Sequence, residues 1–188
     1  NERTALWGLQ PSMLAAIVPV VVVVGYTAPL LAVHYALHGV VNGVHVALAL
    51  FSGINSLICV WEIGLYRYQR DVQAYHASLA KRLPRGALPS PLFLFTDVPL
   101  ADALSARWWA SRVWGTYALV DRSYVERRSF GYGVDVGNGH TTLLPTALVA
   151  LGMSVDVLAA LGVTTAAGGV GVRALGLIAA CMYWQECY

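Results

Sequence analysis

The stretch SMLAAIVPVVVVVGYTAPLLAV, from Ser12 to Val33, decides the class of this protein. It holds no charged side chain, and the region without Asp, Glu, Lys or Arg extends from Thr4 to Trp61. About 20 helical residues cross a bilayer, so this region is long enough for two spans. We therefore expect membrane spans at about 12–33 and 40–62, joined by a short turn from His34 to Gly39.

The overall composition agrees with a membrane protein. Of 188 residues, 57% are hydrophobic and 12% are charged, whereas roughly a quarter of the residues in a soluble domain are charged. The net charge of +2 indicates no acidic polymer as a partner, so nucleic acid is not expected. The three cysteines fit neither a disulfide framework nor a zinc site. We predict an all-α, polytopic helical bundle in an endomembrane or organellar membrane.

Positive charge is concentrated in one connector, 63–129. Ten of the twelve basic residues lie there: Arg67, Arg70, Lys81, Arg82, Arg85, Arg107, Arg112, Arg122, Arg127 and Arg128. Basic loops tend to stay on the cytoplasmic side, so we expect the connector on the cytoplasmic-equivalent side. Its prolines exclude one long helix, and most of it is expected to be a solvated linker with aromatic residues at headgroup level.

Two further spans are expected after the connector. The first covers about 130–153 and contains Pro145, and the second begins near Val172 and continues to the chain end at 188. We therefore expect about four transmembrane helices in a single membrane domain, 1–188, with a fifth helix missing at the C-terminus.

Polar residues inside the spans form two stripes. In the second span they fall within about half of the helix circumference: Asn42, His45, Ser52, Asn55, Ser56, Cys59 and Glu62. In the third span Asp135, Asn138, Gly139 and Thr142 share one face. Such residues either join helices by hydrogen bonds or line a ligand pocket. Asp135 and Glu62 together could serve acid–base chemistry, or Asp135 could bind a cationic amphiphile.

Three histidines near the first turn are candidate ligands. His34 and His38 are four residues apart, and His45 follows seven residues later. Histidine binds metals, and a membrane histidine can ligate haem or the magnesium of a chlorophyll. The alternative is a polar turn at the membrane interface.

The densest constellation is Trp114-x-x-Tyr117-x-x-x-Asp121-x-x-Tyr124, with Asp135 eleven residues later and then Pro145. It resembles a motif of the emopamil-binding protein superfamily, the EXPERA-domain membrane proteins, in which a glutamate stands at the place of Asp135. The resemblance implies a four-helix domain after one extra helix. It also implies a pocket for a hydrophobic ligand, with these ligand-binding residues: Asn55, Glu62, Trp114, Tyr117, Asp121, Tyr124, Asp135 and Asn138. From spacing alone, the four motif residues share one helical face, which an aromatic belt at a membrane boundary also explains.

The sequence departs from the sterol isomerases of that superfamily at one position. Those members carry a histidine four residues before the glutamate that Glu62 matches, and Ile58 stands there in this chain. We therefore expect a protein that binds a lipid or sterol without catalysis, and we assign no catalytic residue. One alternative is an accessory subunit of a photosynthetic or respiratory complex, holding lipid, chlorophyll or carotenoid. Another is a sterol or terpenoid double-bond isomerase that uses Glu62 and Asp135. Expected partners are membrane lipids and either other membrane subunits or further copies of the chain.

Overall fold

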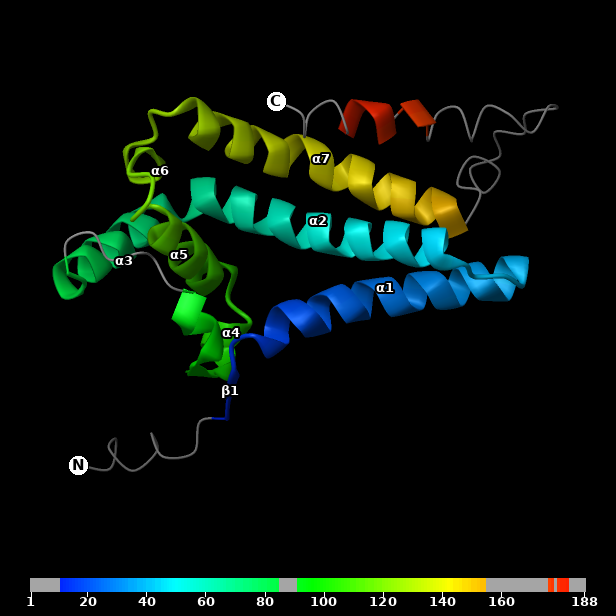
Figure 1. Ribbon diagram of the computed structural model, residues 1–188, viewed down its shortest axis with the longest axis horizontal. Coiled ribbons are helices and arrows are strands. Elements are labelled where there is room, and N and C mark those ends of the chain that lie inside the picture. Colours follow the sequence, from blue (N-terminus) through cyan, green and yellow to red (C-terminus); the bar gives the residue numbers. More distant parts are fainter. Residues whose placement is uncertain (1–10, 85–90, 155–175, 178, 183–188) are drawn as a thin grey trace. The chain divides into compact units, whose positions relative to one another are not determined.

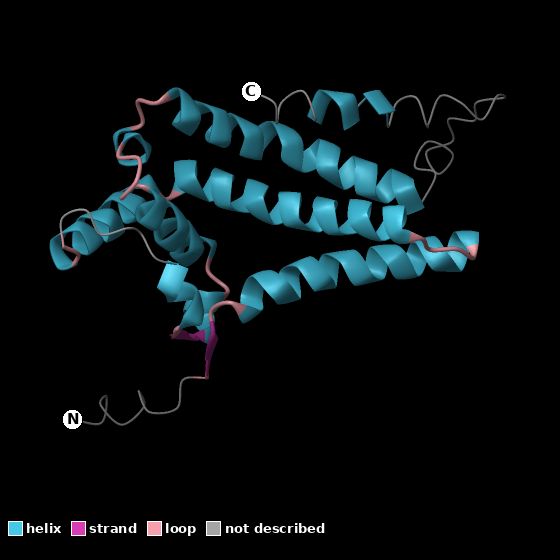
Figure 2. Ribbon diagram, in the orientation of Figure 1, coloured by secondary structure: helices cyan, strands magenta, loops and turns pink. Residues whose placement is uncertain are grey.

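The computed structural model describes residues 11–84, 91–154, 176–177 and 179–182, which are mostly helical (Figures 1 and 2). The chain divides into two compact units. Unit 1 comprises Asn1–Val20 and Trp61–Val136, and unit 2 comprises Val21–Val60 and Gly137–Tyr188. The expected fourth span, 172–188, lies largely outside the described residues.

Two long apolar helices follow each other near the start of the chain. Helices α1 (Ile17–His38) and α2 (Gly43–Arg67) are, among the described helices, the two that are long and apolar enough to cross a membrane. Only 17% of the most apolar stretch of α1 and 28% of that of α2 is buried. A core helix of a soluble protein would bury most of this surface. The exposed apolar faces therefore suit lipid or another apolar partner.

The ends of both helices differ from the expected spans. Ser12–Leu14 forms strand β1, which pairs antiparallel with strand β2 (Asp97–Pro99), so the first helix begins later than predicted. The expected turn at His34 is wrong, because α1 continues to His38 and ends where Gly39 adopts a φ of +69°, a conformation that glycine tolerates.

Asn42 lies outside the second helix and caps it. Its Oδ1 accepts hydrogen bonds from the backbone N–H groups of Val44 (3.0 Å) and His45 (3.1 Å), which is the usual bonding of an N-cap asparagine. The same helix then extends past Glu62 to Arg67. The expected end of the span at Glu62 is therefore wrong. Glu62 lies inside the helix and is only 4% exposed.

Helix α7 (Phe130–Ser154) coincides with the expected third span and contains Pro145. It is as long as α2, but its polar residues make it less apolar than α1 and α2, the two described helices that are apolar enough to cross a membrane. A bundle of four membrane-crossing helices is therefore not shown by the described residues.

The connector is folded, contrary to the expected linker. It contains α3 (Gln69–Arg82), a 3₁₀ turn η3 (Pro91–Phe95), β2, α4 (Leu100–Ala103), α5 (Ala106–Tyr117) and α6 (Ser123–Glu126). Helices α3 and α5 lie side by side (Figure 1), and their contact is close at Gly115, where a Cβ would lie 2.8 Å from Tyr75 Cδ1. As the prolines predicted, no long helix runs through the described connector.

Two buried clusters hold unit 1 together, and aromatic side chains are prominent in both. One contains Leu65, Val72, Ala110, Trp114, Ala118, Tyr124 and Tyr132, and the other contains Ala15, Val18, Val98, Ala103 and Trp109. Trp61 stacks on Trp109 at 5.7 Å, and the Trp109 indole donates to Ala103 O at 2.7 Å. The tryptophans expected at a headgroup boundary thus include a core residue.

Candidate ligand-binding site

Three aromatic residues of the sequence motif contact one another in unit 1. Trp114 and Tyr117 lie on α5, and Tyr124 lies on α6. The Trp114 and Tyr124 rings stack at 5.4 Å with an angle of 7° between their planes, and the Tyr117 ring meets Tyr124 edge-on at 4.8 Å. These separations are within the range of favourable aromatic pairs. We call Trp114, Tyr117 and Tyr124 the aromatic cluster.

The cluster is fixed at one end and open at the other. The Trp114 indole donates to Trp61 O on α2 at 2.7 Å. Trp114 and Tyr124 are buried, whereas Tyr117 is 47% exposed. The cluster therefore exposes the ring of Tyr117 and buries the other two rings.

The motif does not form the single helical face that its spacing predicted. Helix α5 ends at Tyr117, and a turn separates it from Ser123, where α6 begins. Asp121 Oδ1 accepts from the backbone N–H of Ser123 at 2.9 Å and from its hydroxyl. This is the local bonding of an aspartate that starts a turn. The rings meet because the chain turns back, and the Asp121 carboxylate holds that turn.

Tyr124 connects the cluster to helix α7. Its hydroxyl donates to Asp135 Oδ2 at 2.6 Å. Burial of the phenol, followed by its hydrogen bond to Asp135, raises the pKa of Tyr124 far above its usual range. The phenol therefore remains a donor to the carboxylate at ordinary pH. The eleven-residue spacing of the motif corresponds here to a direct contact.

Two buried polar atoms beside Tyr124 have no hydrogen-bond partner among the described residues. Gln69 is 2% exposed; its Nε2 donates to Tyr124 O at 2.6 Å, but its Oε1 has no partner. Tyr132 is 8% exposed, with its ring 6.3 Å from that of Tyr124, and its hydroxyl also has no partner. Such atoms are uncommon, since most buried polar groups are hydrogen-bonded.

Neither of these residues was predicted from the sequence. Tyr132 lies one helical turn before Asp135 on α7, so extending the polar stripe backwards by one turn would have found it. Gln69 is the first residue of α3, and nothing in its sequence neighbourhood distinguishes it from a surface glutamine.

Two residues of the polar stripe of α2 contact α7 within unit 2. Asn55 Nδ2 donates to Thr146 Oγ1 at 2.7 Å, and Cys59 Sγ lies 3.1 Å from Thr142 Oγ1. Thr142 also donates to the backbone oxygen of Asn138 at 2.7 Å. These bonds give Asn55 a role in joining helices. Asn55 and Asn138 belong to unit 2, while Glu62 belongs to unit 1 with the aromatic cluster.

The three candidate histidines come together in unit 2. The ring of His34 lies 4.7 Å from that of His38 and 4.1 Å from that of His45. His34 Nδ1 is 2.8 Å from Met153 O. Within the described ranges, however, no group of three or more histidine, cysteine or acidic side chains is arranged to hold a metal ion.

Comparison of the chain with protein-family models, with curated proteins and with solved structures finds no match.

Proposed function

We propose that the protein is an integral membrane protein that binds a lipid- or sterol-like molecule at the aromatic cluster, without catalysing a reaction. In this proposal α1, α2, α7 and a helix within 172–188 cross an endomembrane or organellar membrane. The basic connector faces the cytoplasmic-equivalent side. The resemblance to the EXPERA-domain proteins belongs to the same proposal, and the contact between Tyr124 and Asp135 supports it.

The observation that carries the proposal is the chemistry around Tyr124. An apolar wall of stacked rings stands beside an acceptor, Gln69 Oε1, and a hydroxyl, Tyr132 Oη, both buried and without partners in the described part of the chain. Ligand sites are mostly apolar, with a few polar groups that fix orientation. In this proposal a ligand hydroxyl donates to the Gln69 oxygen or accepts from the Tyr132 hydroxyl, while its hydrocarbon body contacts the exposed ring of Tyr117.

Asp135 adds a second binding group, which favours a cationic ligand over a sterol. Its carboxylate accepts one hydrogen bond from Tyr124 and is partly exposed. A carboxylate keeps further acceptor positions after one such bond. A hydrophobic amine would place its ammonium group there, whereas a sterol would depend on Gln69 and Tyr132.

Thermal unfolding of the purified protein in detergent tests the proposal. We expect a sterol and a hydrophobic tertiary amine each to raise the melting temperature, since a ligand stabilises the state to which it binds. Asp135→Asn should abolish the amine effect, and Gln69→Ala should reduce the sterol effect. Asp71→Asn is the control, because Asp71 is a carboxylate of the same unit that pairs with Arg107 at 2.7 Å. No stabilisation by either ligand class would contradict the proposal.

An accessory subunit of a larger membrane complex is the second candidate. Exposed valines on α1, such as Val20 and Val21, and the gathered rings of His34, His38 and His45 favour it. The first could contact a neighbouring subunit, and the second could ligate a pigment. Stoichiometric copurification with other membrane subunits would support this candidate over the first. An isomerase using Glu62 and Asp135 would instead move a double bond in a sterol or terpenoid, which product analysis would detect.

A further inference from the structure

A second site of different chemistry lies in unit 1, away from the aromatic cluster. It is a surface pocket of about 520 Å³ between the C-terminal part of α3, the segment from η3 to α4, and α5. Leu83, Phe93 and Val98 give it apolar walls, and Arg82 and Arg112 bring two positive charges to it. The pocket shares no residue with the aromatic cluster, so it is independent of the proposed sterol or amine site.

Arg112 is held by aromatic rings and keeps its donors available. Its Cζ lies 4.0 Å from the centre of the Tyr75 ring and 5.3 Å from that of Trp108, distances typical of cation–π contacts. In the described part of the chain, its guanidinium donates no hydrogen bond and forms no ion pair. A guanidinium fixed by its faces presents its N–H edge as a rigid fork that matches a phosphate.

Arg82 supplies the second cation. Its Nε and one terminal nitrogen contact the Ser78 carbonyl at 3.3 Å and the Ser78 hydroxyl at 3.2 Å. These bonds orient the side chain at the end of α3 and leave further N–H donors of the five that an arginine carries. Two arginines around one pocket favour an anion with several acceptor oxygens.

The position of the pocket favours a lipid as the source of that anion. Val98 and Pro99 line it, and both belong to strand β2, which pairs with β1. Strand β1 ends at Leu14, and the apolar helix α1 begins at Ile17. The chain therefore brings the pocket close to the start of an exposed apolar helix. Trp108, whose ring meets that of Phe93 at 6.2 Å, is of a residue type that is enriched at membrane interfaces.

We propose that this pocket binds a membrane phospholipid, with Arg112 and Arg82 holding the phosphodiester and the apolar wall contacting the start of an acyl chain. Asp102 also lines the pocket, and its carboxylate opposes an anion.

The full chain in a non-ionic detergent can be titrated with phosphatidylglycerol in mixed micelles, with the melting temperature as the readout. We expect phosphatidylglycerol to stabilise the protein and diacylglycerol, which lacks the phosphate, to have no effect. Inorganic phosphate should bind much more weakly than the lipid, because it lacks the acyl chain. Equal binding of diacylglycerol would overturn the phosphate assignment, and equal binding of inorganic phosphate would overturn the lipid assignment.

Single substitutions test the two arginines. Arg112→Gln and Arg82→Gln should each weaken phosphatidylglycerol binding about tenfold, the size expected for loss of a charge-assisted hydrogen bond. Arg112→Lys should not restore full affinity, since an ammonium group lacks the planar fork. Asp102→Asn should strengthen binding. Arg82 is exposed at a helix end, so its variant carries the test if Arg112→Gln fails to fold.

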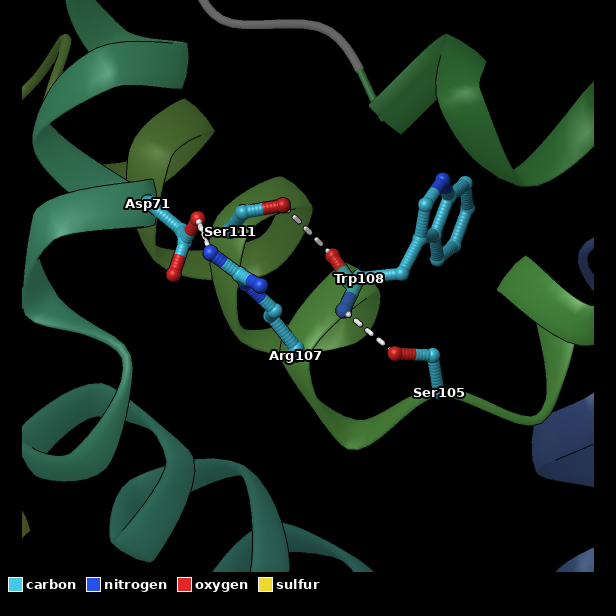
Figure 3. A network of polar contacts seen from close by, with 5 residues as sticks. All are labelled: Asp71, Ser105, Arg107, Trp108 and Ser111. Carbon is cyan, nitrogen blue, oxygen red and sulfur yellow. Dashed lines mark hydrogen bonds and ion pairs between the residues drawn. The ribbon is translucent and has the colours of Figure 1, made fainter.

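Arg107→Gln is the matched control on the same helix. In Figure 3 the Arg107 side chain reaches Asp71 on α3, and the Trp108 ring points away from that pair. Arg107 does not line the pocket, and its charge is offset by Asp71. We expect its substitution to change lipid affinity less than twofold. An equal loss in Arg107→Gln and Arg112→Gln, or no loss in either pocket variant, would overturn the proposal.

Discussion

Tyr124→Phe is predicted to destabilise unit 1 through one hydrogen bond. The change removes the hydroxyl that donates to Asp135 at 2.6 Å and keeps the ring that stacks on Trp114 at 5.4 Å. A hydrogen bond to a charged group contributes about 1.5–3 kcal/mol. Because Asp135 is partly exposed, water replaces part of the loss, and we expect a decrease of about 1–2 kcal/mol in the free energy of unfolding.

The assay is thermal unfolding in detergent, followed by tryptophan fluorescence. For a chain of 188 residues, about 1 kcal/mol lowers the melting temperature by about 2–4 °C, so the expected decrease is about 2–8 °C. Tyr117→Phe is the control, because the Tyr117 hydroxyl donates no hydrogen bond in the described structure. A Tyr124→Phe protein as stable as Tyr117→Phe would refute the reasoning. In a double-mutant cycle with Asp135→Asn, the two changes should be less than additive.

Two further predictions concern other contacts, and a third concerns the ionisation of Tyr124. Gly115→Ala should lower the free energy of unfolding by about 1–3 kcal/mol, because the added Cβ would lie 2.8 Å from Tyr75 Cδ1; Gly133→Ala, which meets nothing within 4 Å, should show no such loss in chemical denaturation. Asn55→Ala should cost about 0.6–1.7 kcal/mol, since it removes the 2.7 Å bond to Thr146; equal resistance of wild type and variant to SDS-induced unfolding would contradict this. The raised pKa of Tyr124 means that its contribution to stability is fully present below pH ~10, the usual tyrosine pKa, and is lost as the pH rises above it. Stability measured up to strongly alkaline pH should therefore fall less steeply in Tyr124→Phe than in wild type.

The two apolar helices could be predicted because a long region without charged residues is visible in the sequence itself and does not depend on tertiary contacts. Their ends could not, because they depend on single local features. Gly39 ends α1 through its positive φ, and Asn42 starts α2 as a cap. Strand β1 was missed because it pairs with residues 97–99, far along the chain, and a three-residue strand leaves no periodic pattern.

Part of the candidate site could also be predicted from the sequence. The resemblance pointed to Trp114, Tyr117, Tyr124 and Asp135. The structure brings these side chains into contact through a turn between α5 and α6, and not on the one helical face that the spacing predicted. Asp121 has the right spacing but a local role, because short polar side chains readily bond to neighbouring backbone. Gln69 is positioned by tertiary packing of α3 against α6. Such a position has no sequence signature, so only the fold reveals it.

Photo-crosslinking in membranes tests the central claim, that a hydrophobic ligand binds at the aromatic cluster. The chain would be labelled with a photoactivatable sterol and, separately, a photoactivatable hydrophobic amine, and then digested with trypsin. Cleavage at the arginines isolates Trp114 and Tyr117 in peptide 113–122 and Tyr124 in peptide 123–127. The account predicts labelling concentrated in these two peptides by at least one probe, and its suppression by excess unlabelled ligand. Labelling concentrated in the tryptic peptide 4–67 and insensitive to competition, for both probes, would contradict it.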